Sequence, residues 1–373
     1  MFDPEVWSAV PFNFWSVVAF VLGCMVGSFL NVCIYRMPRE MSIVHPRSHC
    51  PKCEYMIPAM LNIPLFTWLY LGGKCANCKT PISIRYFLVE LLTGIVFLLT
   101  WIRFGPESAS VAIAYAVLLA GFIVATFIDF EHFIIPDEIT FGGMGAGLIA
   151  SILVPELHQV ANRPEALFRS MVGLVVGAGV VYAILKFGKI LFGREKLAFP
   201  ENSKLIFTET HLHLPDEVRP FEDIFFNEND TIVLEASKVE IVDRCYQNIT
   251  LRLSPKSLQL GEDKYDPLEV KYMEVIADKA VLPREAMGFG DVKFMAGIGA
   301  FLGWQATIFS LMVSAVIGSF VGVSLILSGR KDWSSRLPYG PYIALAAVIW
   351  LVGGREWFEQ LFTIPDLPEP IGP

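Results

Sequence analysis

The sequence has little charge for its size. Asp, Glu, Lys and Arg make up 18% of its 373 residues, whereas 54% are hydrophobic, and the mean hydropathy is +0.52. A chain of this length with so few charged residues is too apolar for a soluble globular protein. The composition therefore predicts a membrane protein.

Other features are also missing. No lysine or arginine precedes Arg36, whereas Asp3 and Glu5 lie close to the first residue. A cleavable signal peptide begins with basic residues, so we expect the first apolar segment to be retained as a helix. The sequence shows no internal repeat and no low-complexity tract. The formal net charge of −8 is spread over the polar segments, and we expect no nucleic-acid partner.

Hydrophobic runs, by contrast, are long and numerous. A membrane-spanning helix needs about 20 apolar residues. Six segments reach or approach that length: residues 14–34, 82–102, 109–130, 139–154, 167–187 and 306–327. Two shorter segments, residues 292–302 and 342–352, would complete eight, with Gly-Trp-Gln at 303–305 supplying the turn after the first of them. We predict an all-α polytopic membrane protein with about eight transmembrane helices.

The basic residues predict an orientation for these helices. With eight spans and the N-terminus outside, 25 of the 29 Lys and Arg residues fall on the cytoplasmic side. The four outside are Arg103, Arg163, Arg169 and Arg355. Such an excess follows the positive-inside rule.

Two hydrophilic segments interrupt the membrane pattern. Residues 36–81 are rich in Cys, Pro and basic residues, and residues 193–285 alternate polar and apolar side chains in KLIFTET, TIVLEAS and NITLRLS. This alternation indicates strands, and predicts a small β-rich cytoplasmic domain inserted between the fifth and sixth spans. Glycines crowd residues 141–150 and 172–181, where they favour close helix packing.

These segments suggest four regions. Residues 1–103 hold the first helix, a cytoplasmic zinc-binding loop and the second helix, and residues 104–192 form membrane core. Residues 193–285 are the insert, and residues 286–373 return to membrane core.

Four of the seven cysteines form two Cys-x-x-Cys pairs, Cys50 with Cys53 and Cys75 with Cys78. Four thiolates in this spacing complete a closed, tetrahedral structural zinc site. Two disulfides or two redox dithiols are the alternatives, but a cytoplasmic loop is reduced and no thioredoxin-like pattern surrounds the pairs. The pattern favours zinc.

The three other cysteines stand apart from these pairs. They are Cys24, Cys33 and Cys245. We expect each of them to be a small buried hydrophobic residue rather than a ligand.

Two acidic residues lie where charge is unfavourable. Asp129 ends the third span, where the negative end of the helix dipole disfavours a carboxylate. Asp291 lies in MGFGDVKFMAGIGAF, before an apolar helix of about a dozen residues that covers roughly 18 Å of a hydrocarbon core near 30 Å. A helix cap would explain Asp291 alone, but its depth suggests a buried carboxyl group with a function.

The chain crosses the membrane twice between Asp129 and Asp291, so both lie on the cytoplasmic side and can meet. Two carboxyl groups about 3 Å apart share one proton and can activate water against a peptide carbonyl. Asp137 follows Pro136 and is explained more simply as an acid in the first turn of the next helix.

Several short motifs accompany these aspartates. They are IIPD (134–137), GFGDVK (288–293), GSFLNVCIYRMP (27–38), ELLTG (90–94), LPYGPY (337–342) and the two cysteine pairs. Together they resemble the bacterial type IV prepilin leader peptidases and N-methyltransferases, which share the GxGD motif with intramembrane aspartic proteases. The resemblance covers nearly the whole chain except residues 193–285.

The resemblance implies that Asp129 and Asp291 are the catalytic dyad. The residues that would support the catalytic loops are Gly288, Gly290, Pro136 and Lys293. The implied substrates are type IV prepilin and type II secretion pseudopilin precursors, cut between the glycine that ends a short basic leader and the hydrophobic segment that follows. The implied location is the bacterial inner membrane, with lipid around the helices and the active site facing the cytoplasm.

For members with the cysteine-bearing loop, the resemblance also implies methylation of the freed N-terminal amine by S-adenosylmethionine. No glycine-rich loop of the dinucleotide type is present to place the donor, and LGGK at 71–74 is a weak match. Our candidates for binding it are Asn31, Arg36 and Glu90, polar residues at the membrane end of the N-terminal region.

Two other classes of function compete with a peptidase. Intramembrane carboxylates also relay ions in transporters and channels, although the inverted halves typical of transporters are not visible in the sequence. A non-enzymatic assembly scaffold could present the zinc loop and the β-rich insert to cytoplasmic partners. Only a peptidase would shorten a prepilin substrate.

Overall fold

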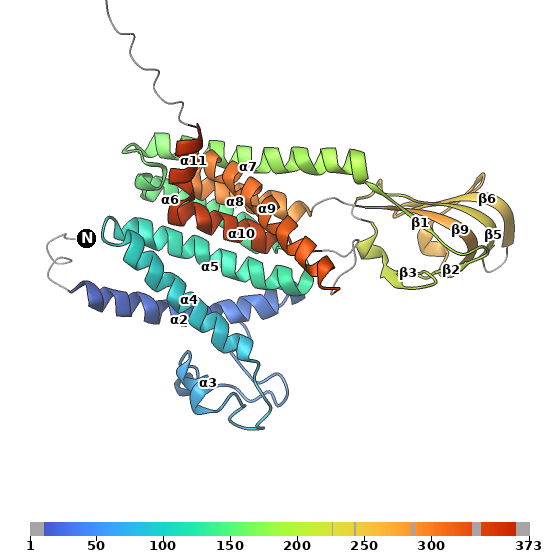
Figure 1. Ribbon diagram of the computed structural model, residues 1–373. Coiled ribbons are helices and arrows are strands. Elements are labelled where there is room, and N and C mark those ends of the chain that lie inside the picture. Colours follow the sequence, from blue (N-terminus) through green and yellow to red (C-terminus); the bar gives the residue numbers. More distant parts are fainter. Residues whose placement is uncertain (1–10, 226, 242–243, 285–287, 330–336, 363–373) are drawn as a thin grey trace, which may run out of the picture. The chain divides into compact units, whose positions relative to one another are not determined.

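The computed structural model describes residues 11–225, 227–241, 244–284, 288–329 and 337–362. The chain divides into two compact units. The helical unit comprises residues up to Val181 and those from Phe289 onwards, and the β unit comprises Tyr182–Gly288. Figure 1 labels the elements of both.

The helical unit is built from long apolar helices joined by short turns. Its long helices are α2 (Phe12–Arg36), α4 (Ile84–Phe104), α5 (Ala109–His132), α6 (Asp137–Leu153), α7 (Arg163–Phe192) and α9 (Trp304–Leu327). Shorter ones are α3 (Phe66–Tyr70), α8 (Phe289–Leu302), α10 (Gly340–Ile349) and α11 (Arg355–Phe362), with a π-helical turn at Trp350–Gly354. Short 3₁₀ turns occur at Met37–Arg39, Ala59–Leu61 and Pro155–His158.

Each of the eight apolar segments predicted to span a membrane coincides, within a few residues, with one of these helices. Within the described part of the chain, five helices are long and apolar enough to cross a bilayer: Phe12–Arg39, Ile84–Phe104, Ala109–His132, Arg163–Leu191 and Trp304–Leu327. Helices α6, α8 and α10 are shorter. Gly303, with φ of 84°, is the sole residue between α8 and α9, as the predicted turn requires.

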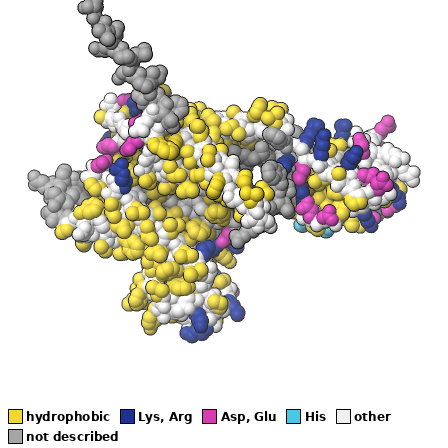
Figure 2. All heavy atoms as spheres, in the orientation of Figure 1, with side chains coloured by type: hydrophobic (Ala, Val, Ile, Leu, Met, Phe, Trp, Pro, Cys, Tyr) yellow, Lys and Arg dark blue, Asp and Glu magenta, His cyan; other side chains and the backbone are white. Residues whose placement is uncertain are grey.

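Hydrophobic side chains cover much of the visible face of this unit (Figure 2). On α9, for example, Val316, Phe320 and Leu327 are 70%, 75% and 83% exposed. A soluble protein rarely exposes so continuous an apolar surface. The helical unit therefore has the surface of a membrane protein.

Glycines allow α6 and α7 to press against α8. A Cβ on Gly173 would lie 2.1 Å from the carbonyl oxygen of Gly299, and one on Gly177 would lie 2.4 Å from that of Met295. Gly147 is in similarly close contact, since an added Cβ there would lie 2.7 Å from Cβ of Ala300. Close packing thus explains these three glycines, as predicted, and buries nearly all of α8. For the other glycines of the two runs the prediction was wrong, because a Cβ on any of them would meet no described atom within 4 Å: Gly142, Gly143, Gly145 and Gly179.

The N-terminal helices pack just as closely. Gly27 of α2 approaches α4 so tightly that a Cβ would lie 2.8 Å from Cα of Glu90. Cys24 and Cys33 are 6% and 3% exposed, which confirms their prediction as buried apolar residues. Cys33 belongs to a cluster that joins α2 and α4 to Val124 and its neighbours on α5.

The β unit is one antiparallel sheet. Its strands are β1 (Arg194–Ala198), β2 (Lys204–Phe207), β3 (His211–His213), β4 (Val218–Pro220), β5 (Ile232–Ile241), β6 (Arg244–Ser254), β7 (Ser257–Leu260), β8 (Asp263–Tyr265) and β9 (Met273–Pro283). Their order is β4-β3-β2-β9-β5-β6-β7-β8, and β1 also pairs with β9. The three alternating sequences quoted above supply β2, β5 and β6, so the strand prediction is confirmed there.

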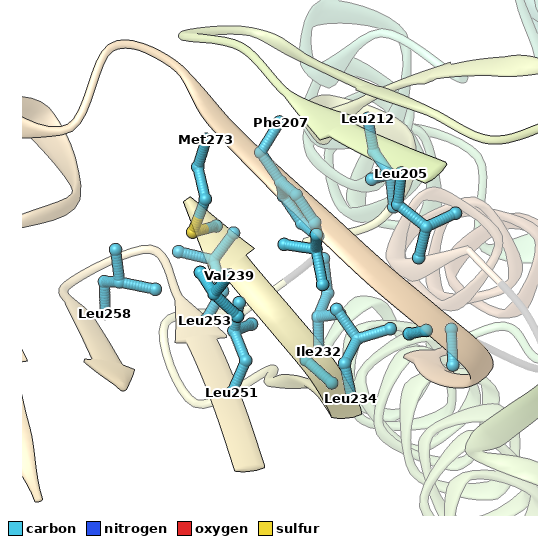
Figure 3. Packing of buried hydrophobic residues seen from close by; sticks show 14 of the residues in the cluster. Leu205, Phe207, Leu212, Ile232, Leu234, Val239, Leu251, Leu253, Leu258 and Met273 are labelled. Atoms are coloured by element: carbon cyan, nitrogen blue, oxygen red, sulfur yellow. The ribbon is translucent and has the colours of Figure 1, made fainter. Parts of the chain in front are cut away.

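Alternate residues of these strands form one apolar core, which includes Leu205, Ile232, Leu234 and Leu251 (Figure 3). Cys245 lies outside it and is exposed, so the prediction that it is buried was wrong. The residues of β6 that belong to this core or pack against it are Tyr246, Ile249, Leu251 and Leu253, so the strand's alternation is interrupted next to the left-handed residue Asn248. Cys245 directly precedes Tyr246 and therefore lies on the other face of the strand.

The two ends of the sheet insert lie side by side. Arg194, the first residue of β1, is the antiparallel partner of Pro283, the last residue of β9. The N–H of Arg284 donates a hydrogen bond of 3.1 Å to the carbonyl oxygen of Gly193. The chain thus leaves the sheet next to the point where it entered.

Candidate active site and metal centre

Asp129 lies in the last turn of α5 and is 5% exposed. The helix ends at Phe133, which is left-handed and donates its N–H to the Asp129 carbonyl at 3.0 Å. The Asp129 side chain reaches a different helix, because the N–H of Gly340 donates to its Oδ2 at 2.8 Å. Gly340 begins α10, so the positive end of that helix faces a carboxyl group that its own helix disfavours.

Asp291 is the third residue of α8 and is 8% exposed. The helix begins two residues earlier, at Phe289, so Asp291 lies within the first turn rather than at the capping position. The structure therefore does not support the alternative that Asp291 is the N-cap of this helix. Eleven of the fourteen α8 residues, Asp291 included, are buried.

An aromatic contact aligns the two helices that carry these aspartates. The rings of Phe122 on α5 and Phe294 on α8 pack edge to face with centroids 5.4 Å apart. Asp129 follows Phe122 by about two helical turns and Asp291 precedes Phe294 by about one, so each aspartate lies on the same helix face as its phenylalanine.

Both aspartates adjoin the start of α10. Asp291 lies within electrostatic range of Tyr339, and Asp129 lies within that of Tyr342. The Tyr339 hydroxyl is also 3.0 Å from Oγ of Ser314 on α9. The segment Tyr339–Tyr342 is thus the common neighbour of the two carboxyl groups.

Ile135, from the IIPD motif, packs between the two glycines at this site. A Cβ built on Gly290 would lie 3.4 Å from Cβ of Ile135, and one on Gly340 would lie 3.0 Å from its Cδ1. Ile135 is 7% exposed. The loop between α5 and α6 therefore contacts the residue before Asp291 and the residue that binds Asp129.

The other residues predicted to support the catalytic loops have distinct positions. Lys293 forms an ion pair with Asp137, the first residue of α6, and its ammonium group lies 5.0 Å from the centre of the Phe141 ring. This pair ties the first turn of α8 to that of α6. Pro136 occupies the N-cap position of α6, and Gly288 is exposed just before α8.

Four residues at this site were not predicted from the sequence as site residues: Gly340, Ile135, Phe122 and Phe294. A signal existed for Gly340, since glycine followed by proline within LPYGPY marks a helix start at which the backbone is closely approached. Phe122 and Phe294 lie in uniformly apolar helices, where nothing in the sequence distinguishes them from their neighbours.

The four paired cysteines converge, with their Sγ atoms all within 4.8 Å of one another. Sγ of Cys50 lies 3.7 Å from that of Cys78, and Sγ of Cys53 lies 3.9 Å from that of Cys75. Thiolates about 2.3 Å from a tetrahedral zinc ion stand about 3.8 Å apart, whereas disulfide sulfurs stand about 2.05 Å apart. The geometry fits a four-thiolate metal site.

The two pairs are built alike. In the first, the N–H of Glu54 donates to the carbonyl oxygen of Cys50 at 2.9 Å, and in the second the N–H of Lys79 donates to that of Cys75 at 3.2 Å. Both donors are left-handed residues that directly follow the second cysteine of the pair. Sγ of Cys78 lies 3.3 Å from Oγ1 of Thr80, and hydrogen bonding with Thr80, through its side chain first and its backbone second, lowers the pKa of Cys78 to about 6.

Arg36 and Glu90 connect the cysteine loop to the membrane helices. Arg36 donates to the carbonyl oxygens of Ser42 at 2.9 Å and Pro46 at 2.8 Å, and Glu90 accepts from the N–H of Leu65 at 2.7 Å. Both are buried.

Asn31, the third candidate for binding the methyl donor, is also buried. It donates to the carbonyl oxygen of Tyr86 at 3.0 Å, and its Oδ1 has no hydrogen-bond partner among the described residues. A role of these three residues toward a methyl donor stays a prediction.

Fold and site together define a membrane protein with two buried aspartates, one of them hydrogen-bonded to the start of α10, and a cluster of four cysteines that could hold a metal ion. Two family models match the chain. One is described as the bacterial peptidase A24 N-terminal domain and covers residues 21–104. The other is described as the type IV leader peptidase family and covers residues 116–199 and 271–323.

Curated relatives agree with these models. The prepilin leader peptidase/N-methyltransferase of Aeromonas hydrophila is 28% identical over 386 residues, covering 96% of this chain and 98% of its own. The enzyme of that name from Myxococcus xanthus is 47% identical over 133 residues, which is 36% of this chain and 39% of the relative.

A third relative is the type 4 prepilin-like proteins leader peptide-processing enzyme of Escherichia coli O78:H11. It is 37% identical over 199 residues, covering 48% of this chain and 71% of its own length. No solved structure matches the chain. The chain belongs to the type IV leader peptidase family.

Proposed function

We propose that this protein is a membrane aspartic endopeptidase that removes the leader from type IV prepilin or type II secretion pseudopilin precursors and N-methylates the new N-terminal residue. The observation that carries the proposal is the placement of two buried aspartates around Ile135: Gly340, which donates to Asp129, and Gly290, which precedes Asp291, both approach this side chain. Family membership supports both activities, because the curated relatives are named for them.

Cleavage follows from two carboxyl groups that share one proton. The ionised carboxylate takes a proton from water, and the resulting hydroxide attacks the peptide carbonyl while the protonated carboxyl group donates its proton to the carbonyl oxygen. Collapse of the tetrahedral intermediate breaks the C–N bond. The leaving amine takes the proton that the first carboxyl group removed from water, and the second carboxyl group regains its proton from a hydroxyl group of the intermediate. The hydrogen bond from Gly340 holds Oδ2 of Asp129, so the orientation of this carboxyl group is set before substrate binds.

The proposed arrangement in the membrane has eight spans with the N-terminus outside. The helical state of all eight apolar segments supports it, as does the placement of 25 of the 29 basic residues on one side. In this arrangement both aspartates face the cytoplasm of the bacterial inner membrane, where a prepilin leader would be cut.

The proposed metal is zinc, held by Cys50, Cys53, Cys75 and Cys78, whose sulfur separations support tetrahedral coordination. It would fold the loop between α2 and α4 and take no part in peptide cleavage.

The proposed methyl donor is S-adenosylmethionine, which would bind in the region of residues 1–103 and supply the methyl group. Arg36 and Glu90 use hydrogen-bonding groups within the chain, which leaves Oδ1 of Asn31 as a buried atom without a described partner. These residues do not by themselves form a binding site for the donor, so we derive no step of methyl transfer from them.

The alternative functions fit less well. An ion-coupled transporter or channel would use the buried carboxylates, and a scaffold would use the zinc loop and sheet, but neither accounts for membership in a family of leader peptidases.

One assay separates the three. Purified protein is incubated in detergent with a prepilin precursor, with and without S-adenosylmethionine, and the products are weighed by mass spectrometry. The proposal predicts a shortened product in both samples and a product heavier by one methyl group only with the donor. An unshortened precursor from folded protein would contradict it.

A further inference from the structure

An apolar groove lies between α5 and α6, with α8 as its floor. Its cavity volume is about 170 Å³, and residues of all three helices line it. Phe122 comes from α5, Gly142 and Gly143 from α6, and Phe294 and Phe301 from α8. The groove therefore separates two helices that are consecutive in the chain.

Three glycines of this groove are not required by the packing of the chain itself. A Cβ added to Gly121, Gly142 or Gly143 would have no described atom within 4 Å. Gly147, one helical turn further along α6, instead presses directly against α8. Bare glycine backbone that faces apolar surroundings allows another helix to approach closely.

The groove begins next to the candidate dyad. Phe294 lies one helical turn after Asp291, and Phe294, Gly297, Ile298 and Phe301 have the spacing of a single helix face. At the other wall, Glu138 marks the start of the groove on α6, beside the ion pair of Asp137 with Lys293. The groove thus runs along the helices away from the two carboxyl groups.

We propose that this groove binds the hydrophobic helical segment of the substrate that directly follows the cleaved bond. The inference rests on the proposed function, because it needs a substrate with such a segment. Three features select this occupant. The groove begins one helical turn from Asp291, its walls carry bare glycines, and the acid Glu138 lies at the end where a basic leader would emerge. A lipid chain or a second copy of the protein would need only the apolar surface.

Filling the groove tests this directly. Gly142→Leu and Gly143→Leu place side chains in it, whereas Gly145→Leu is the matched control, since Gly145 lies on the same helix, has no described atom within 4 Å of its Cβ position and does not line the groove. The substrates are a whole prepilin precursor and a short peptide that spans the cleavage site but lacks the hydrophobic segment.

The quantity measured is the ratio of kcat/KM for the precursor to kcat/KM for the short peptide. In the groove variants we expect this ratio to fall at least about tenfold, since misplacing a substrate by about 1 Å can cost about a hundredfold in rate. The control should keep the wild-type ratio. A wild-type ratio in both groove variants would overturn the inference. If wild-type protein cleaves neither substrate, the proposed function itself fails.

A cross-linking experiment identifies the occupant independently of rates. Benzoylphenylalanine replaces Val117, which lines the groove, or Ile113, an exposed residue of the same helix outside it. With Asp129→Asn present to prevent cleavage, irradiation in phospholipid nanodiscs should join the precursor to position 117 and not to position 113. Adducts at position 117 with phospholipid alone, or with a second copy alone, would contradict the proposal.

Discussion

The N–H of Gly340 and Oδ2 of Asp129 are joined by a hydrogen bond of 2.8 Å across 211 residues of sequence. A Cβ at position 340 would lie 2.9 Å from that same oxygen, so a larger residue cannot occupy the position unless the carboxyl group or the helix moves. The start of α10 therefore leaves no room for a side chain beside the Asp129 carboxyl group.

Gly340→Ala should displace the Asp129 carboxyl group while leaving the substrate groove in place. Because a displacement of about 1 Å can cost about a hundredfold in rate, we expect kcat to fall by about tenfold to a hundredfold, with KM changing much less. Steady-state kinetics on a prepilin precursor measures both constants. Gly179→Ala is the matched control, since its Cβ would meet no described atom. Equal kcat values in the two variants would contradict this role for Gly340.

Asp129→Asn and Asp291→Asn should each abolish leader cleavage, because asparagine is nearly isosteric but cannot hold or accept the shared proton. We expect the single-turnover rate to drop at least about a thousandfold in each, and the double variant to be no slower, since residues that act as one unit are not additive. Asp137→Asn weakens only the ion pair with Lys293, so its single-turnover rate should fall far less. A single-turnover rate within a few-fold of wild type for either dyad variant would remove that residue from the dyad.

Metal analysis should find about one zinc ion per chain, as a four-thiolate site requires. Combining Cys50→Ser with Cys75→Ser removes one ligand from each pair and should abolish binding. Cys245→Ser controls for loss of a thiol, because Cys245 is exposed in the β unit and far in sequence from the cluster. Zinc that remains bound after the double substitution would rule out the proposed ligands.

Cleavage and methylation should be separable. A carboxyl dyad that activates water offers nothing to hold a sulfonium donor, so the two reactions need different surfaces. We expect substitution of the zinc cysteines to reduce methyl incorporation from labelled S-adenosylmethionine more than it reduces leader removal. Folded variants that lose both activities to the same extent would argue for a single shared site.

Deleting residues 196–283 and closing the gap with a short Gly/Ser bridge should leave an active peptidase. The ends can be joined because Arg284, the first residue after the deletion, donates its N–H to the carbonyl oxygen of Gly193 at 3.1 Å, two residues before Glu195. The measurement is leader cleavage by a deletion protein that elutes as a single species in detergent. Complete inactivity of such a protein would show that the β unit takes part in catalysis.

Local sequence patterns were enough to predict the elements. The apolar runs coincide with helices, the alternating segments include β2, β5 and β6, and the cysteine spacing brings four sulfurs together, because each of these features depends on neighbours along the chain. The same reasoning failed for Cys245, since the alternation of β6 is interrupted next to the left-handed residue Asn248 and the sequence pattern does not reveal such an interruption.

The contacts that shape the candidate site depend on distant segments. Ile135 between Gly290 and Gly340, and Phe122 against Phe294, join parts of the chain separated by more than 150 residues. No periodicity or motif specifies which residue of one apolar helix meets which residue of another. Both aspartates were predicted as site residues from their unfavourable positions in the sequence. The residues that surround them could be named only from the fold.

The hydrogen bond from Leu65 to Glu90 has a consequence for chains that would lack the cysteine loop. Glu90 lies on α4 between two closely packed helices, and the loop supplies its backbone donor. Without that donor, the buried carboxyl group would keep the Ser28 hydroxyl as a partner but lose its backbone hydrogen bond, which is worth about 1.5–3 kcal/mol for a charged group. Loss of the loop therefore makes an acid at position 90 less favourable, so a shortened natural or designed version of this protein should be stabilised by an apolar or small residue there.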